Sequence, residues 1–192
     1  MRVLMTGFKP FNNEKTNSSE YLVQNYTNPA INLKKIILNV EYDKDAEKTI
    51  NIIKDFKPDL VLMFGLAAER KYITMEYLAL NIKNASIKDN AGIKFENLID
   101  KNNLVLTTNL DIINIYNKLN NNKIKISYNA GTFVCNDLYY KVLNYIYKND
   151  LKTKCLFIHL PYNEMETSKN NNFIAKEEQL RLIDDIVNKI LE

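Results

Sequence analysis

Apolar residues along the chain gather in short segments that predict strands. Residues 60–64 form a continuous apolar run, which is typical of a strand buried on both faces of a parallel sheet. Residues 72–81 are rich in β-branched and aromatic side chains and predict extended chain, with Glu76 in its middle. Four further strands are predicted over residues 2–6, 35–40, 124–127 and 155–160.

Between these strands, apolar residues recur every three or four positions, which predicts amphipathic helices. In residues 43–56 one apolar face runs through Ala46 and Ile53. Ser18 or Ser19 is expected to cap an earlier helix. Further helices are predicted over residues 112–119, 135–147 and 176–191.

The order of these segments predicts the fold class. Strands that alternate with helices form three-layer α/β domains, in which helices cover both faces of a mostly parallel, twisted sheet. Residues 7–13 contain Gly, Pro and Asn and predict a loop, and the polar residues 84–103 predict an irregular segment. No internal repeat or linker interrupts the pattern, so residues 1–192 are expected to form a single α/β domain.

Composition and charge narrow the classes of protein to consider. Hydrophobic residues make up 46% and charged residues 26% of the chain, as in folded globular proteins. The apolar runs are far too short to span a membrane, and the first residues lack the features of a signal peptide. We therefore expect a cytoplasmic protein that does not bind membranes. The net charge of +3 comes mainly from scattered lysines, which argues against nucleic-acid binding.

The scarcest residue types exclude several kinds of site. The chain has one histidine, two cysteines and four glycines. A zinc site of the usual Cys/His kind needs more ligands than these, so no metal site is expected. Neither a P-loop nor the glycine motif of dinucleotide-binding proteins occurs. Cys135 and Cys155 are expected to be reduced thiols rather than a disulfide.

Three residues carry the candidate chemistry. His159 lies at the carboxyl end of a predicted strand, where open α/β sheets form their sites. Cys135 follows a loop of small residues and enters a helix, whose dipole and unpaired N–H groups should lower the pKa of the thiol. Glu76 lies in a mainly apolar strand, and a buried carboxylate needs a partner such as a histidine. Together these residue types predict nucleophilic acyl transfer.

Each of these residues also has a purely structural interpretation. A single histidine in an apolar run is often a core residue bonded to the backbone, and Cys135 is also compatible with a small buried hydrophobe. Glu76 is compatible with a half-exposed strand residue that faces solvent or Arg70. Cys155 fits the structural interpretation better than Cys135, because it begins a buried strand far from any loop glycine.

At these residues the chain strongly resembles pyroglutamyl peptidase I, also called pyrrolidone-carboxylate peptidase, a family of cysteine peptidases. The resemblance spans nearly the whole chain and rests on five motifs in the family's order, which makes it specific. The motifs are Gly7-Phe8-Lys9-Pro10-Phe11, Ile73-Thr74-Met75-Glu76 with Ala79-Leu80-Asn81, Asp89-Asn90-Ala91-Gly92, Ala130-Gly131-Thr132-Phe133-Val134-Cys135-Asn136, and Phe157-Ile158-His159-Leu160-Pro161.

The resemblance implies a three-layer α/β/α sandwich that removes an N-terminal 5-oxoproline (pyroglutamyl) residue from peptides. It also implies that no cofactor is used and that the chain assembles as a homo-oligomer, often a tetramer. Cys135 is implied to be the nucleophile, His159 the general base and then acid, and Glu76 the orienting acid. A pocket for the flat lactam ring is implied at Phe8, Phe11, Phe133, Val134 and the backbone near Leu66. For Phe8 and Phe11, ordinary packing of the loop on the core is the alternative.

The chain departs from the family pattern at several positions. Asn12 and Asn13 replace a Gly-Gly pair, Glu69 replaces a glycine, and Ser86 stands where the family often has an arginine. The substitutions at Glu69 and Ser86 keep open the alternative of a catalytically weak relative that binds pyroglutamyl or other cyclic amides. A nucleoside-processing enzyme on a similar scaffold is a further alternative, although no phosphate-binding glycine loop supports it. The intact cysteine, histidine and glutamate favour a working peptidase.

Overall fold

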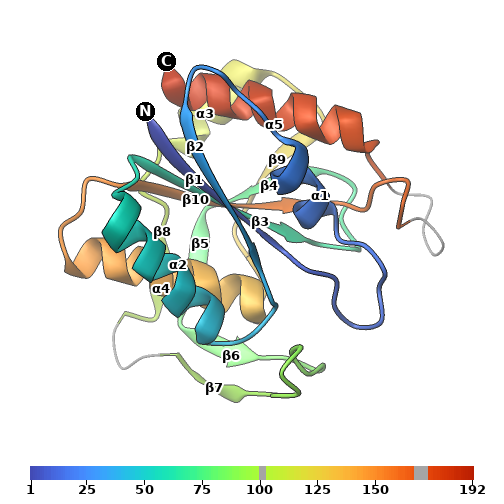
Figure 1. Cartoon of the computed structure of the whole chain (residues 1–192), viewed down its shortest axis with the longest axis vertical. Helices are drawn as coiled ribbons and strands as arrows, with labels where there is room; N and C mark the ends of the chain where they lie inside the picture. The colour runs from blue at the N-terminus through green and yellow to red at the C-terminus, as the bar shows by residue number, and fades with distance from the viewer. Residues whose placement is uncertain (100–102, 167–172) are drawn as a thin grey trace.

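The computed structural model describes residues 1–99, 103–166 and 173–192, and a six-stranded sheet forms the centre of this part of the chain. Its strands are β1 (Arg2–Phe8), β2 (Asn32–Leu38), β3 (Leu60–Leu66), β4 (Ile73–Glu76), β9 (Ile124–Ser127) and β10 (Lys154–Leu160). Their order across the sheet is β2-β1-β3-β10-β4-β9 (Figure 1). Neighbouring strands are parallel except for β10 and β4, which are antiparallel.

Helices cover both faces of this sheet. On one face lie α1 (Ser18–Asn25), α3 (Ile112–Leu119) and α5 (Lys176–Leu191), and on the other lie α2 (Lys44–Phe56) and α4 (Val134–Lys148) (Figure 1). The predicted three-layer α/β/α sandwich around a mostly parallel sheet is therefore confirmed.

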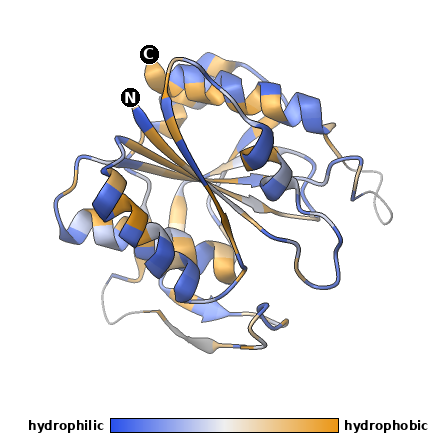
Figure 2. Cartoon of the chain, in the orientation of Figure 1, coloured by the Kyte–Doolittle hydropathy of each residue, from blue (hydrophilic) through white to orange (hydrophobic). Residues whose placement is uncertain are grey.

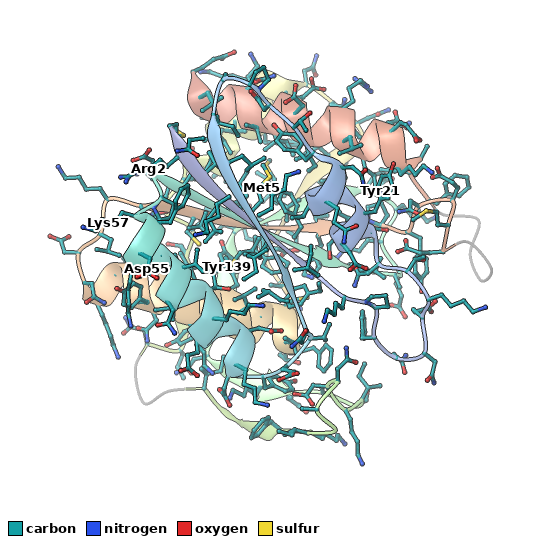
Figure 3. The ribbon with its side chains drawn as sticks, viewed as in Figure 1. Arg2, Met5, Tyr21, Asp55, Lys57 and Tyr139 are labelled. Atoms are coloured by element: carbon teal, nitrogen blue, oxygen red, sulfur yellow. The ribbon has the colours of Figure 1, made fainter. Side chains whose placement is uncertain are left out.

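Each helical layer packs on the sheet through its own apolar core. Along β1, Val3 and Met5 belong to the core under α1, α3 and α5, whereas Leu4 and Phe8 belong to the core under α2 and α4. This division follows from the period of two in a strand, which sends successive side chains to opposite faces. Figure 2 shows the apolar residues concentrated on the central strands, and Figure 3 places Met5 and Tyr139 in the interior of the molecule.

After β4 the chain leaves the main sheet and forms two small antiparallel pairs, β5 with β8 and β6 with β7. These strands are β5 (Leu78–Leu80), β6 (Ile82–Asn84), β7 (Glu96–Leu98) and β8 (Val105–Thr107). The predicted extended segment 72–81 is therefore broken at Tyr77, so that Glu76 ends a strand instead of lying in its middle. The predicted irregular segment 84–103 contains β7, and its residues 100–102 lie outside the described residues.

The first strand and the first helix differ from their predicted bounds. β1 continues through Gly7 to Phe8, two residues into the predicted loop. Helix α1 packs closely on this strand, because a Cβ atom at Gly7 would lie 2.3 Å from the carbonyl oxygen of Ser19. The cap of α1 is Asn17 rather than Ser18 or Ser19, and its side chain accepts a hydrogen bond from the Ser19 N–H at 3.0 Å.

The second strand lies earlier than predicted, at Asn32–Leu38 instead of residues 35–40. Val40 cannot continue the strand because its φ is 65°, in the left-handed region. The other helices keep their predicted ranges to within one residue at each end. Among the described residues, no helix is long and apolar enough to cross a membrane.

Candidate active site

Cys135 is the second residue of α4 and so lies in the first turn of a helix, as the sequence predicts. The first main-chain hydrogen bond of this helix runs from the Asp137 N–H to the Phe133 carbonyl at 3.1 Å. The N–H groups of residues 134–136 therefore have no carbonyl acceptor within the helix. They form the positive end of the helix dipole beside the thiol.

The buried side chain of Asn136 fixes this end of α4. Its amide donates to the carbonyl groups of Leu80 and Ile82 at 2.8 and 3.0 Å, and its oxygen accepts from the Leu80 N–H at 2.8 Å. Because Asn136 directly follows Cys135, these three bonds hold the candidate nucleophile at a fixed place relative to β5 and β6.

His159 and Glu76 meet from neighbouring antiparallel strands. His159 Nδ1 lies 2.8 Å from Glu76 Oε1, and the two residues are 4% and 0% exposed. Glu76 is the last residue of β4 and lies opposite Phe157, two residues before His159 on β10. The complete burial of Glu76 excludes the half-exposed position that its sequence context also allowed.

Arg70 is a further member of this group that the sequence motifs did not assign to the site. Its Nη1 contacts Glu76 and Thr74, and its Nη2 donates to the carbonyl of Asn129 at 2.8 Å. Asn129 lies in the loop that leads into α4. Glu76 therefore has both of the partners considered from the sequence, His159 and Arg70, and Arg70 also ties it to the loop before the nucleophile.

The sulfur of Cys135 reaches the sheet at Gly65. A Cβ atom at Gly65 would lie 2.8 Å from Cys135 Sγ and 2.9 Å from the ring of Phe157. Gly65 pairs with His159 across the parallel strands β3 and β10. The thiol of Cys135 and the imidazole of His159 also line one cavity, although they come from a helix and a strand on different parts of the chain.

Burial and charge determine the protonation states of these side chains. Burial opposes ionisation of Glu76, but the hydrogen bond and charge of His159 and the charge of Arg70 outweigh it, so the pKa of the carboxyl is lowered. Burial lowers the pKa of His159 below its ordinary value of 6.5, although Glu76 acts in the opposite direction. Burial, together with the charge of Glu76, raises the pKa of Cys135 to about 12. The resting site therefore holds a carboxylate, a neutral imidazole and a thiol at neutral pH.

The raised pKa of Cys135 corrects the expectation that the helix terminus lowers it. The backbone N–H of Cys135 does favour the thiolate, and so does the charge of Arg70. Both are outweighed by desolvation of the sulfur, which lies between the end of α4 and the sheet at Gly65. The nearby carboxylate of Glu76 adds to this cost.

A cavity of about 110 Å³ opens beside the thiol and the imidazole. Its lining residues are Phe8, Phe11, Asn17, Val40, Leu66, Ala130, Phe133, Cys135 and His159. Val134 was expected in this wall but does not line the cavity, because its side chain is fully buried in the core under α4. Phe8 lines the cavity and also belongs to that core, so its packing on the core is confirmed, while its contact with a lactam ring stays a prediction.

Three lining residues were missed by the sequence analysis. Ala130 stands inside the motif that contains Cys135, and Asn17 stands before two serines at the start of a helix, so both had a local signal. Val40 had none, because a left-handed φ of 65° is rare for a β-branched residue and is imposed by the surrounding structure.

Aromatic contacts support one side of the cavity. The ring of Phe133 lies 5.9 Å from that of Phe11, centroid to centroid, and 5.5 Å from that of Tyr42. Phe133 and Tyr42 meet edge to face, an arrangement that aromatic pairs favour. Phe133 is therefore held between the loop after β1 and the segment after β2.

The loop after β1 makes a tight turn at Asn12 and Asn13, which stand where the family has a Gly-Gly pair. Asn12 and Asn13 have φ values of 52° and 64°, and the Glu14 N–H donates to the Phe11 carbonyl at 3.0 Å. Asparagine is the residue that enters the left-handed region most readily after glycine, so this turn beside Phe11 forms without glycine.

The other departures lie away from the cavity wall. Glu69 and Ser86 are both exposed, and neither is among the described residues that line the cavity. Cys155 is a fully buried free thiol within β10, which agrees with its structural interpretation. Within the described ranges, no group of three or more His, Cys, Asp or Glu side chains is placed to hold a metal ion.

Comparisons with known proteins agree on one family. The family model described as pyroglutamyl peptidase matches residues 1–181. The pyrrolidone-carboxylate peptidase of Brachyspira hyodysenteriae is 34% identical over 195 residues, which cover 97% of each chain. That of a Thermoanaerobacter species is 38% identical over 168 residues, which cover 84% of this chain and 83% of the relative.

Solved structures give the same result. A mutant pyrrolidone carboxyl peptidase from Pyrococcus furiosus superposes with a TM-score of 0.92 at 26% identity, covering 100% of this chain and 98% of the other. The pyroglutamyl peptidase I of Bacillus amyloliquefaciens superposes with a TM-score of 0.91 at 27% identity, covering 98% and 94%. The similarity therefore extends over almost the whole length of both chains.

Proposed function

Because the chain belongs to the pyroglutamyl peptidase family, we propose that Cys135, His159 and Glu76 together carry its reaction. The protein is a pyroglutamyl peptidase I, a cysteine-type hydrolase that acts on peptides. One observation carries the assignment of the residues: Cys135 and His159 line the same cavity, and Nδ1 of His159 is bonded to the buried Glu76.

The reaction begins with transfer of the Cys135 proton to His159. Since Nδ1 of His159 is bonded to Glu76, we assign Nε2 as the nitrogen that accepts the proton of the thiol. The thiolate then attacks the carbonyl carbon that joins the pyroglutamyl residue to the rest of the peptide. The carbonyl oxygen takes the negative charge, and the backbone N–H of Cys135 at the start of α4 is the donor that we assign to stabilise it.

Collapse of this intermediate breaks the C–N bond and leaves the pyroglutamyl group as a thioester on Cys135. Protonated His159 gives its proton to the departing amine, so the shortened peptide leaves with a neutral amino group. His159 then takes a proton from water, and the resulting hydroxide attacks the thioester. Release of 5-oxoproline restores the thiol.

Glu76 and Arg70 prepare the histidine for these transfers. The carboxylate of Glu76 keeps the hydrogen on Nδ1 and stabilises the imidazolium when it forms. The guanidinium of Arg70 keeps Glu76 ionised and disfavours a charged His159 in the resting state. Arg70 is therefore assigned as a positioning residue that acts through Glu76.

Selectivity follows from the small, mainly apolar cavity beside the thiol. The side chains of Phe8, Phe11 and Phe133, with the backbone near Leu66, form the proposed site for the flat lactam ring. A lactam carries no charge, whereas an ordinary N-terminal amine carries a positive charge that this apolar wall leaves without a partner. The pocket therefore favours a pyroglutamyl residue over proline, which has the same ring size.

The proposal extends to the organisation of the protein. We propose a single domain over residues 1–192, since the family match covers residues 1–181, and assembly into a homotetramer by resemblance to the family. Both cysteines are free, and catalysis requires that Cys135 remain a thiol. A reducing compartment such as the cytoplasm is therefore the proposed place of action.

The test is release of a fluorophore from a pyroglutamyl amide by wild-type protein and by Cys135→Ala, with a prolyl amide as control. The expected result is cleavage of the pyroglutamyl amide alone, lost in the variant and after thiol alkylation. Binding of pyroglutamyl peptides without cleavage, by reduced and folded protein, would instead support the weak-binder alternative that the exposed Glu69 and Ser86 motivate.

A further inference from the structure

Asn90 belongs to the Asp89-Asn90-Ala91-Gly92 motif, to which the mechanism above gives no role. Its side-chain amide donates two hydrogen bonds, to the carbonyl of Pro10 at 3.0 Å and to the carbonyl of Asn39 at 2.7 Å. Its backbone N–H donates a third, to the carbonyl of Val40 at 3.0 Å. One residue therefore joins two segments that are about thirty positions apart in the sequence.

Both of these segments contribute to the wall of the substrate cavity. Pro10 directly precedes Phe11, and Asn39 directly precedes Val40, and the side chains of Phe11 and Val40 line the cavity. The parallel pairing of β1 with β2 ends directly before these residues, with the bond from the Lys9 N–H to the Leu38 carbonyl at 2.9 Å. Among the described residues, no backbone hydrogen bond joins the two segments beyond this point. The amide of Asn90 extends the connection past the end of the ladder.

The loop that carries Asn90 is itself firmly held. The carboxylate of Asp89 accepts from the N–H groups of Ala91 and Ile93 at 3.0 and 2.8 Å, and from the N–H of Tyr42 at 3.0 Å. Asp89 is 5% exposed, so these bonds are shielded from water. A rigid base of this kind lets the Asn90 amide determine the positions of its partners rather than follow them.

The backbone conformation of Val40 shows that other contacts must hold this segment in place. Its φ of 65° is unfavourable for a β-branched residue, so the segment would relax toward ordinary backbone angles if it were released. The bond from the Asn90 backbone and the bond to the neighbouring Asn39 carbonyl both act against that relaxation.

We propose that Asn90 is a positioning residue that determines specificity: its amide holds the Phe11 segment and the Val40 segment at the separation that fits a lactam ring. This inference rests on the proposed substrate. The carboxamide is needed because one nitrogen offers two donors to two carbonyl groups. An aspartate at this position has the same shape but no donor, and its charge would repel both carbonyl oxygens.

The position also allows a clean test, because Asn90 is exposed. Removing exposed hydrogen bonds changes the free energy of unfolding little, so the variants are expected to fold. Asn90→Ala removes the side chain, and Asn90→Asp keeps its shape without the donors. Asn188→Ala is the matched control, since Asn188 is an exposed asparagine of α5 that donates to Asp184 at 3.1 Å, away from the cavity lining.

The measurements are kcat and KM on a pyroglutamyl amide, together with the midpoint of thermal unfolding. Both Asn90 variants should raise KM about tenfold and change kcat less than about twofold. The rate of Cys135 alkylation should stay at the wild-type value, since the thiol and histidine are untouched. Asn188→Ala should match wild type in every measurement.

Binding of pyroglutamyl-alanine to proteins carrying Cys135→Ser separates this inference from the proposed function. Adding Asn90→Asp to that background should weaken binding about tenfold, whether or not the wild-type protein turns over substrate. An unchanged KM and an unchanged Kd would overturn the role of Asn90. A fall in kcat together with a clearly lower unfolding temperature would also overturn it, because this combination indicates a general structural role of Asn90. Absence of turnover in wild type, with weakened binding in the variant, would overturn the proposed function alone.

Discussion

The sulfur of Cys135 lies where Gly65 has no side chain: a Cβ atom at Gly65 would lie only 2.8 Å from it. Gly65 is also the strand partner of His159. The missing side chain therefore lets the thiol from α4 approach the strand pair that carries the imidazole. A sequence position with no chemistry of its own thus controls where the nucleophile lies.

The first prediction concerns Gly65→Ala. The added methyl group must displace the sulfur of Cys135, at 2.8 Å, and the ring of Phe157, at 2.9 Å, and Phe157 is fully buried. A shift of the nucleophile by about 1 Å is expected to lower kcat/KM by about 100-fold. The measurement is the rate of pyroglutamyl amide cleavage, with thermal unfolding to establish that the variant is folded. Wild-type activity in a folded variant would contradict the prediction.

The second prediction concerns the reactivity of Cys135 toward iodoacetamide in a Cys155→Ala background. Because the pKa of Cys135 is raised to about 12, the thiolate fraction should increase with pH across the accessible range. The alkylation rate is therefore expected to rise about tenfold per pH unit between pH 7 and 9. A rate that is already constant between pH 6 and 8 would instead indicate a resting thiolate–imidazolium pair.

The third prediction concerns the pH dependence of kcat/KM. A neutral His159 is required as base, and its pKa is lowered below 6.5, so activity should fall only in acid below that value. Arg70 lowers and Glu76 raises the pKa of His159. Arg70→Met is therefore expected to move the acid limb of the profile to higher pH, and Glu76→Gln to move it to lower pH.

Glu76→Gln should also reduce kcat by about 100-fold or more, because the carboxylate no longer stabilises the imidazolium. The control for Arg70→Met is Arg181→Met, which removes a cation whose side chain is 60% exposed on α5. This control is expected to leave the profile unchanged. Shifts of the same sign in Arg70→Met and Glu76→Gln would contradict the assigned electrostatic roles.

The fourth prediction concerns Asn136→Ala. This change removes three hydrogen bonds and leaves polar groups of Leu80 and Ile82 without their partner. The free energy of unfolding should fall by about 3 kcal/mol, which corresponds to a decrease of about 6–12 °C in Tm. Asn149→Ala is the matched control, because Asn149 donates one exposed bond to Tyr145 at the other end of α4. Its effect should stay within about 0.5 kcal/mol. Equal losses in the free energy of unfolding from the two changes would show that the buried bonds of Asn136 stabilise the protein no more than the exposed bond of Asn149.

The sequence alone determined the elements whose physics is local. The strand at residues 60–64 and the helix at residues 176–191 could be predicted without knowing what they pack against. A continuous apolar run indicates a strand buried on both faces, and apolar residues at helical spacing indicate a helix buried along one side. The same local reasoning, with the family motifs, selected Cys135, His159 and Glu76.

Only the tertiary structure decided how those residues act. Whether Glu76 pairs with His159 or Arg70 depends on strand order and register, and the antiparallel β4–β10 pair together with the turn at Arg70 provides both partners. The left-handed Val40 and the bridging amide of Asn90 result from contacts between distant segments.

The shift of the Cys135 pKa shows most clearly what the sequence determines and what the tertiary structure determines. The position of Cys135 at the start of a helix was readable from the sequence, and it favours a thiolate. The cost of burying that charge depends on the sheet that packs against the sulfur, and on the carboxylate that the fold brings near. The local sequence determines which ionisable groups are present and which of them lie near the end of a helix. Desolvation and long-range charge, which decide their protonation, exist only once the chain has folded around them.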